Sequence, residues 1–159
     1  MQDTNYASQQ LDYYRQRQSR PGWQDLLQIL FSGILSTADD EDGRQFLNMM
    51  GSNLAKQHPL PPARTVGELE DALNDLLTEF DWGFVKIEPT EQELTLVHCA
   101  WPAASPHNDD THWRYALATV LEGAYSEWLQ AQGGKNHVPL RWQNHDREGS
   151  LVFRYKNGL

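Results

Sequence analysis

The sequence predicts an α+β fold: helices packed on antiparallel β-hairpins, with a long central helix at the subunit interface. Apolar residues recur at helical spacing through residues 23–80 and again through 111–132. Two pairs of short apolar runs, within 84–99 and 138–155, are each joined by a turn-like link, as in hairpins. The chain has 159 residues, which is the length of one domain. We therefore expect a single α+β domain at residues 23–159.

Residues 1–22 precede this domain as a flexible N-terminal arm. The first 20 residues are polar and lack a sustained apolar period, which is typical of a mobile tail or a marginal helix. Two interpretations stay open: an arm without consequence, or an arm that orders against a partner or ligand. In the second case Tyr6, Tyr13 and Tyr14 are its contact residues.

Three helices are predicted in the first half of the domain. The first follows Pro21-Gly22, and its apolar face is Trp23, Leu26, Leu27, Leu30, Phe31, Ile34 and Leu35. The second is capped by Asp39 and Asp40 and stops before the proline run at 59–62. The third opens on a Thr65-x-x-Glu68 capping box.

The period changes after Trp82-Gly83, where glycine lets the chain turn from helix to strand beside a bulky residue. Residues 84–88 and 93–99 are predicted to form a hairpin across the link at 89–92. A second hairpin is predicted from strands at about 138–144 and 151–155.

The long helix runs from about Thr111 to Gln132 and ends at Gly133-Gly134. Two adjacent apolar stripes run along it: Trp113, Leu117, Val120, Ala124 and Trp128, then Leu121, Tyr125 and Leu129. Together they exceed the arc of roughly 100° that a surface helix normally shows. We therefore expect both a core role and an oligomer contact for this helix.

Composition excludes several classes of partner. The net charge is −9 and the pI about 5.0, so the chain lacks the basic face that nucleic acid or an anionic membrane requires. No apolar stretch approaches the roughly 20 residues of a membrane span, so no membrane insertion is expected. One cysteine and no recognisable signal peptide favour the cytoplasm, with the periplasm left open.

The sequence contains no strong catalytic or metal-binding motif. His98 and Cys99 are neighbours on a predicted strand and point to opposite faces. We interpret His98 as a hydrogen-bonded strand histidine, with a zinc site shared with His107 and His112 as the alternative. Cys99 is expected to be a small core residue, and the acidic run at 39–42 is explained by helix capping.

Glu122 is the one carboxylate in the middle of the long helix's apolar surface. A structural hydrogen-bond acceptor is the favoured interpretation, and a weak glycosidase using Glu122 is the alternative. Asn74 and Glu122 should each have a hydrogen-bond partner, and one place for that partner is across a subunit interface. Of the six tryptophans, only Trp101 and Trp142 are expected to be exposed, with rings on which a sugar could stack.

A set of motifs resembles the D subunit of the bacterial cellulose synthase operon. These motifs are Leu73-Asn74-Asp75-Leu76-Leu77, Trp82-Gly83-Phe84-Val85, Leu94-Thr95-Leu96-Val97-His98, and Leu121-Glu122-Gly123-Ala124-Tyr125-Ser126-Glu127-Trp128. Their order and spacing match, and the resemblance covers about residues 24–133. We assign structural or interface roles to Asn74, Trp82, Gly83, His98, Trp113, Glu122, Gly123, Tyr125 and Trp128.

The resemblance implies a non-catalytic accessory protein. Because the residues contain no metal-binding or cofactor motif, we also expect no cofactor and no metal. Members of the family form an octamer built from dimers. They promote β-1,4-glucan export and crystalline packing, by arranging synthase complexes in rows with other proteins of the operon. Their N-terminal arms line passages through the octamer that can hold glucan, which makes Tyr6, Tyr13 and Tyr14 of this arm the candidates for glucan contact.

A second hypothesis is a small-ligand-binding sensor domain, because a long helix with two hairpins loosely resembles the vinyl-reductase and haem nitric-oxide-binding folds. His98, Cys99 and His112 would then be the ligand contacts.

Overall fold

The computed structural model describes residues 6–11, 13–14, 21–37, 40–102, 111–133, 140–147 and 149–156. The elements are, in order, α2 (Pro21–Thr37), α3 (Asp40–Gln57), α4 (Val66–Phe80), β1 (Phe84–Pro89), β2 (Glu93–Cys99), α5 (Thr111–Ala131), β3 (Leu140–Arg147) and β4 (Ser150–Lys156). Residues 6–11 and 13–14 of the arm are helical as well. The predicted α+β class is confirmed.

Local signals set the ends of α3 and α4. Helix α3 ends at Gln57, just before the proline run, and carries acidic residues in its first turn. Helix α4 has the predicted capping box. The Glu68 backbone N–H donates to Thr65 Oγ1 at 3.1 Å, and the Arg64 N–H donates to the Glu68 carboxylate at 2.7 Å. Asp81 closes α4 in the left-handed conformation.

The four strands form one antiparallel sheet in the order β1-β2-β4-β3. Both predicted hairpins are present, and β2 pairs with β4 to join them, with Leu96 opposite Phe153. Strands β3 and β4 are longer than predicted, with Arg147 opposite Ser150 and a register shift between Gln143 and Arg147.

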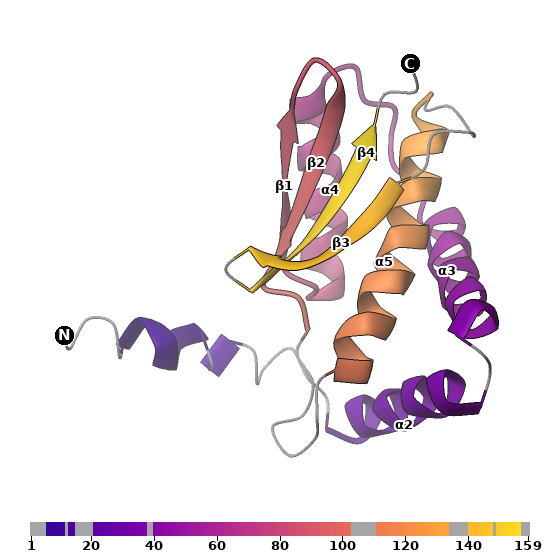
Figure 1. The fold of residues 1–159 in the computed structure, drawn as a ribbon. Coiled ribbons are helices and arrows are strands. Elements are labelled where there is room, and N and C mark those ends of the chain that lie inside the picture. The colour runs from indigo at the N-terminus through magenta and orange to yellow at the C-terminus, as the bar shows by residue number, and fades with distance from the viewer. Residues whose placement is uncertain are drawn as a thin grey trace.

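The helices pack against one face of the sheet and against each other (Figure 1). Helix α4 lies behind β1 and β2, and α5 lies beside β3, with α3 packed along its length. Helix α2 crosses the N-terminal end of α5, where the rings of Phe31 and Trp113 are 5.4 Å apart. The core lies between α4, α5 and the sheet, and its largest fully buried side chains include Trp128, Tyr125 and Phe153.

Both predicted apolar stripes of α5 face this core except at Val120, which is half-buried. Leu117, Leu121, Trp128 and Leu129 are each at most 5% exposed. The core role of α5 is therefore confirmed. Because the chain itself buries these side chains, the stripes no longer provide an argument for a subunit contact through α5.

Helix α2 differs from its prediction. Its predicted apolar face is only partly covered, because Phe31, Ile34 and Leu35 are half-buried whereas Trp23 is 68% exposed. Among the described elements, the helix packs mainly against α5 and, less extensively, against α3.

Candidate functional site

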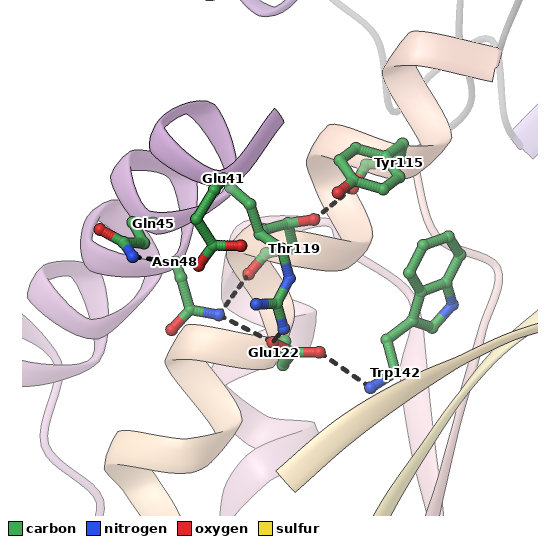
Figure 2. Close-up of polar contacts among 8 residues, drawn as sticks. Glu41, Gln45, Asn48, Tyr115, Thr119, Glu122 and Trp142 are labelled. Atoms are coloured by element: carbon green, nitrogen blue, oxygen red, sulfur yellow. Dashed lines mark hydrogen bonds and ion pairs between the residues drawn. The ribbon is translucent and has the colours of Figure 1, made fainter. Parts of the chain in front are cut away.

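Glu122 lies at the centre of a polar network that joins three elements (Figure 2). Its Oε1 accepts from Arg44 Nη2 at 2.9 Å and from Asn48 Nδ2 at 3.0 Å, both on α3. Its Oε2 accepts from the backbone N–H of Trp142 on β3 at 2.9 Å. Glu122 is 6% exposed, so these bonds satisfy a carboxylate that is almost fully desolvated. This arrangement agrees with the structural interpretation, and the partners belong to the same chain rather than to a second subunit.

Two glycines allow α3 and α5 to approach closely beside this network. A Cβ on Gly123 would overlap the backbone carbonyl of Asn48, and a Cβ on Gly51 would overlap that of Val120. The close approach expected for Gly123 is therefore confirmed. It also brings Asn48 within reach of the Glu122 carboxylate.

His98 is a fully buried, hydrogen-bonded strand histidine. Its Nε2 lies 2.6 Å from the Trp82 carbonyl, and its Nδ1 lies 2.6 Å from the Tyr125 hydroxyl. Burial lowers the pKa of His98 to about 4. Burial also raises the pKa of Tyr125 well above its usual range, so the phenol keeps its proton. Both ring nitrogens are engaged within the protein, as the structural interpretation requires.

The residues of the sensor hypothesis are not brought together. Cys99 lies on the face of the sheet opposite His98, and His112 is exposed in the first turn of α5. His107 lies outside the described residues. No three His, Cys, Asp or Glu side chains converge on a metal-sized site within the described part of the chain. Cys99 is half-buried rather than part of the core, because it projects from the face that the core does not cover.

Gly83 and Trp82 form the junction between α4 and β1. Gly83 has φ +87°, and a Cβ there would overlap the Cys99 carbonyl, so the position requires glycine on both counts. The half-buried Trp82 ring packs on Phe80, with centroids 5.2 Å apart. Asn74, on α4, holds the following strand by bonding the N–H and the carbonyl of Val85.

The other predicted tryptophan positions divide into confirmed and wrong. Trp113 and Trp128 are buried, at 4% and 2% exposure. Trp101 is also buried and donates to the Gly149 carbonyl at 2.8 Å, so its prediction as an exposed platform is wrong. Trp142 is only partly exposed, because it packs edge-on against Tyr115 and lies near the Arg114 guanidinium.

The three tyrosines of the arm are exposed. Tyr6, Tyr13 and Tyr14 are 57%, 53% and 65% exposed, and with Gln9 and Gln10 they line a hollow of about 260 Å³. Figure 1 shows this helical segment away from the rest of the fold.

Exposed apolar side chains are concentrated near the N-terminus. Eight lie on α2 and α3: Trp23, Leu26, Leu27, Ile29, Leu30, Phe46, Met49 and Met50. We call these eight residues the α2–α3 apolar surface. Beyond residue 50, Phe84 is the one large apolar residue of the described chain that is exposed to this degree.

Sequence reasoning missed Arg44, Asn48 and Glu70 as partners of buried groups. Arg44 and Asn48 stand four residues apart, with Gly51 three residues later, so they share one face of a predicted helix. That spacing, with a glycine for close approach, was the available signal. It could not indicate which residue of another helix the face would meet.

Comparison with known proteins agrees with the resemblance seen in the sequence. The family model for the cellulose synthase D subunit matches residues 9–156, a wider range than the expected 24–133. A cellulose synthase operon protein D from Komagataeibacter xylinus is 31% identical over 119 residues, covering 73% of this chain and 74% of the relative. The protein of the same name from Komagataeibacter sucrofermentans matches to the same extent. The chain therefore belongs to the family of cellulose synthase D subunits.

Proposed function

We propose that this chain is a non-catalytic accessory subunit of bacterial cellulose synthesis that acts as a self-associating scaffold. Family membership supports the pathway. The observation that supports self-association is the α2–α3 apolar surface, whose side chains are exposed in the described part of the chain.

The composition of α2 argues that a partner covers it. Asp25 is its one charged residue along Pro21–Thr37, so the helix lacks the charged face of an ordinary surface helix. Ile29 and Trp23 are nevertheless 69% and 68% exposed. A helix that is apolar on most sides belongs in an interior, and here an interior exists only if a second surface packs against it.

The extent of the surface fits a stable association. A standard protein interface buries about 800 Å² on each partner, and eight large side chains exposed by 36–69% present an area of that order. Interfaces between identical subunits are also more apolar than transient ones. A second copy of this chain is therefore the partner we propose, and a dimer-built octameric ring is the assembly.

In this proposal the ring works with other proteins of the operon and orders synthase complexes in rows. The subunit assists glucan export and crystalline packing by holding components in place. None of the helices in the described residues is long and apolar enough to cross a membrane. We place the subunit in the cytoplasm, where a single unpaired cysteine is ordinary.

The arm, residues 1–22, is the proposed glucan contact. The exposed rings of Tyr6, Tyr13 and Tyr14 offer flat apolar faces to sugar rings, and the Gln9 and Gln10 amides can hydrogen-bond their hydroxyls. β-1,4-Glucan is neutral, so a chain with a net charge of −9 needs no charge complement to bind it.

The assembly is tested by light scattering coupled to size-exclusion chromatography. We expect a mass several times the 18.3 kDa of one chain. Ile29→Glu should dissociate the particle with unchanged circular dichroism, because it buries a charge in the interface. Gln92→Glu, at an exposed polar position in the turn between β1 and β2 and outside the α2–α3 apolar surface, is the matched control and should leave the mass unchanged. A monomeric wild type contradicts the proposal.

The arm is tested by deleting residues 1–20. The fold and the oligomer should survive, whereas cellulose made by cells carrying the deletion should lose crystalline order in X-ray diffraction. Full-length protein should bind a cello-oligosaccharide in calorimetry, and Tyr6→Ala/Tyr13→Ala/Tyr14→Ala should not. Normal cellulose from the deletion cells shows that the arm is dispensable.

A further inference from the structure

Strand β1 is an edge of the sheet, and side chains of α4 bond the N–H groups on the side that no strand pairs with. In an antiparallel pair alternate residues bond the partner strand, and the residues between them point their N–H and C=O groups outward. In β1, the backbone groups of Phe84, Lys86 and Glu88 face β2. The outward residues are Val85, Ile87 and Pro89.

Side chains of helix α4 accept a hydrogen bond from each outward-facing N–H group of this strand. Asn74 Oδ1 accepts from the Val85 N–H at 2.7 Å, and Asn74 Nδ2 donates to the Val85 carbonyl at 3.0 Å. A Glu70 carboxylate oxygen accepts from the Ile87 N–H at 2.8 Å. Pro89, the third outward residue, has no N–H.

The spacing of the two elements explains the match. Glu70 and Asn74 are four residues apart on a helix, a rise of about 6 Å. Ile87 and Val85 are two residues apart on a strand, about 6.6 Å. The distance between the two helix residues therefore matches the distance between the two strand residues.

At the opposite edge of the sheet, one backbone N–H group is also bonded by a helix side chain. Strand β3 lies at that edge, and its Trp142 N–H donates to the Glu122 carboxylate of α5. Each edge strand is thus hydrogen-bonded sideways to a side chain of the helix packed against it.

We infer that Glu70 and Asn74 close the β1 edge to strand addition. An open edge strand offers unpaired N–H and C=O groups to any other extended chain. Here polar side chains of α4 bond the Val85 and Ile87 N–H groups and the Val85 carbonyl in place of a fifth strand. This inference concerns the sheet alone and does not depend on a role in cellulose synthesis.

The first test is hydrogen exchange at single backbone amides, measured by NMR. In the wild type, Val85 and Ile87 should be protected although no strand bonds them. Glu70→Ala should expose the Ile87 amide and Asn74→Ala the Val85 amide, each by at least tenfold, while Leu96 in the central strand changes little. Unprotected Val85 and Ile87 amides in the wild type overturn the inference.

The second test asks whether an opened edge accepts a strand. The probe is a fluorescein-labelled peptide with the sequence of residues 93–98, which pair with β1 in the native sheet. Its anisotropy should rise with Glu70→Ala/Asn74→Ala and stay flat with the wild type.

Leu73→Ala is the matched control for this second test. It removes a side chain of α4 that is 1% exposed and so destabilises the fold while leaving both guarding residues in place. It should not bind the peptide. If the double variant binds no better than the wild type, or if Leu73→Ala binds equally well, the inference is wrong.

Discussion

The Tyr125 hydroxyl donates a hydrogen bond to His98 Nδ1 across the core, with the two atoms 2.6 Å apart. The direction follows from the other ring nitrogen. Nε2 faces the Trp82 carbonyl, which can only accept, so Nε2 carries the proton and Nδ1 of the neutral ring is the acceptor. This chain of bonds ties α5, β2 and the end of α4 together.

The protonation of His98 predicts an acid-sensitive fold. Its pKa is about 4 when folded and 6.5 when unfolded, so the unfolded chain binds the proton first as the pH falls. Stability from this group is complete above pH 6.5 and declines by about 3 kcal/mol between pH 6.5 and 4. Urea unfolding at several pH values measures it. His98→Gln should flatten the curve over this interval; an equal slope in both proteins contradicts the assignment.

Removing the Tyr125 hydroxyl should destabilise the core without changing its shape. Tyr125→Phe leaves the buried Nδ1 acceptor of His98 without a donor, a loss of about 1–3 kcal/mol in unfolding free energy. Tyr115→Phe is the control, since Tyr115 is only half-buried, and should stay within about 0.5 kcal/mol. Equal effects of the two substitutions would show that the Tyr125–His98 bond has no special weight.

Trp128 and Trp23 should respond to truncation in different ways. Trp128 is 2% exposed and donates to the His58 carbonyl, so Trp128→Ala should cost about 3–5 kcal/mol of stability. Trp23 is 68% exposed, so Trp23→Ala should leave the unfolding of the isolated chain nearly unchanged and weaken self-association. Thermal unfolding and light scattering, at several protein concentrations, separate these effects.

Gly123→Ala should force α3 and α5 apart. The added methyl group meets the backbone of Asn48, which cannot rotate away, so we expect a loss of about 2–3 kcal/mol. Gly67→Ala is the matched control, because its Cβ would meet only Thr65 Oγ1 at 3.8 Å. In the first turn of α4 it should be neutral or slightly stabilising. A neutral Gly123→Ala would contradict the close contact.

Glu122→Gln should loosen the attachment of β3 and α3 to α5. Both carboxylate oxygens accept from donors, so either orientation of the amide turns its NH₂ toward one of them. We expect a loss of about 2–3 kcal/mol by urea unfolding. The same pair of proteins tests the glycosidase alternative: glucan hydrolysis by the wild type that disappears in Glu122→Gln would contradict a structural role.

Much of the local structure could be predicted from the residues. The bounds of β2 and α4 follow from alternation and from the Thr65–Glu68 capping box, which are local effects. The close contact at Gly123 and the turn at Gly83 were also predictable, because few positions other than tight contacts or unusual backbone angles require glycine.

The partners of polar groups could not be predicted. The sequence showed that Asn74 and Glu122 need hydrogen-bond partners. That Asn74 bonds Val85 depends on the angle between α4 and β1, and that Glu122 bonds Arg44 depends on the angle between α3 and α5. Those angles depend on packing over whole elements, not on the spacing within one of them.

The α+β class, the order of elements and the family motifs were thus contained in the sequence, since they depend on periodicity and on local capping. Only the tertiary structure decided which apolar residues face water. It buries Trp101 beneath the turn at Gly149 and leaves Trp23 exposed on α2. Periodicity identifies the apolar face of an element, but burial depends on whether the fold places another element against that face.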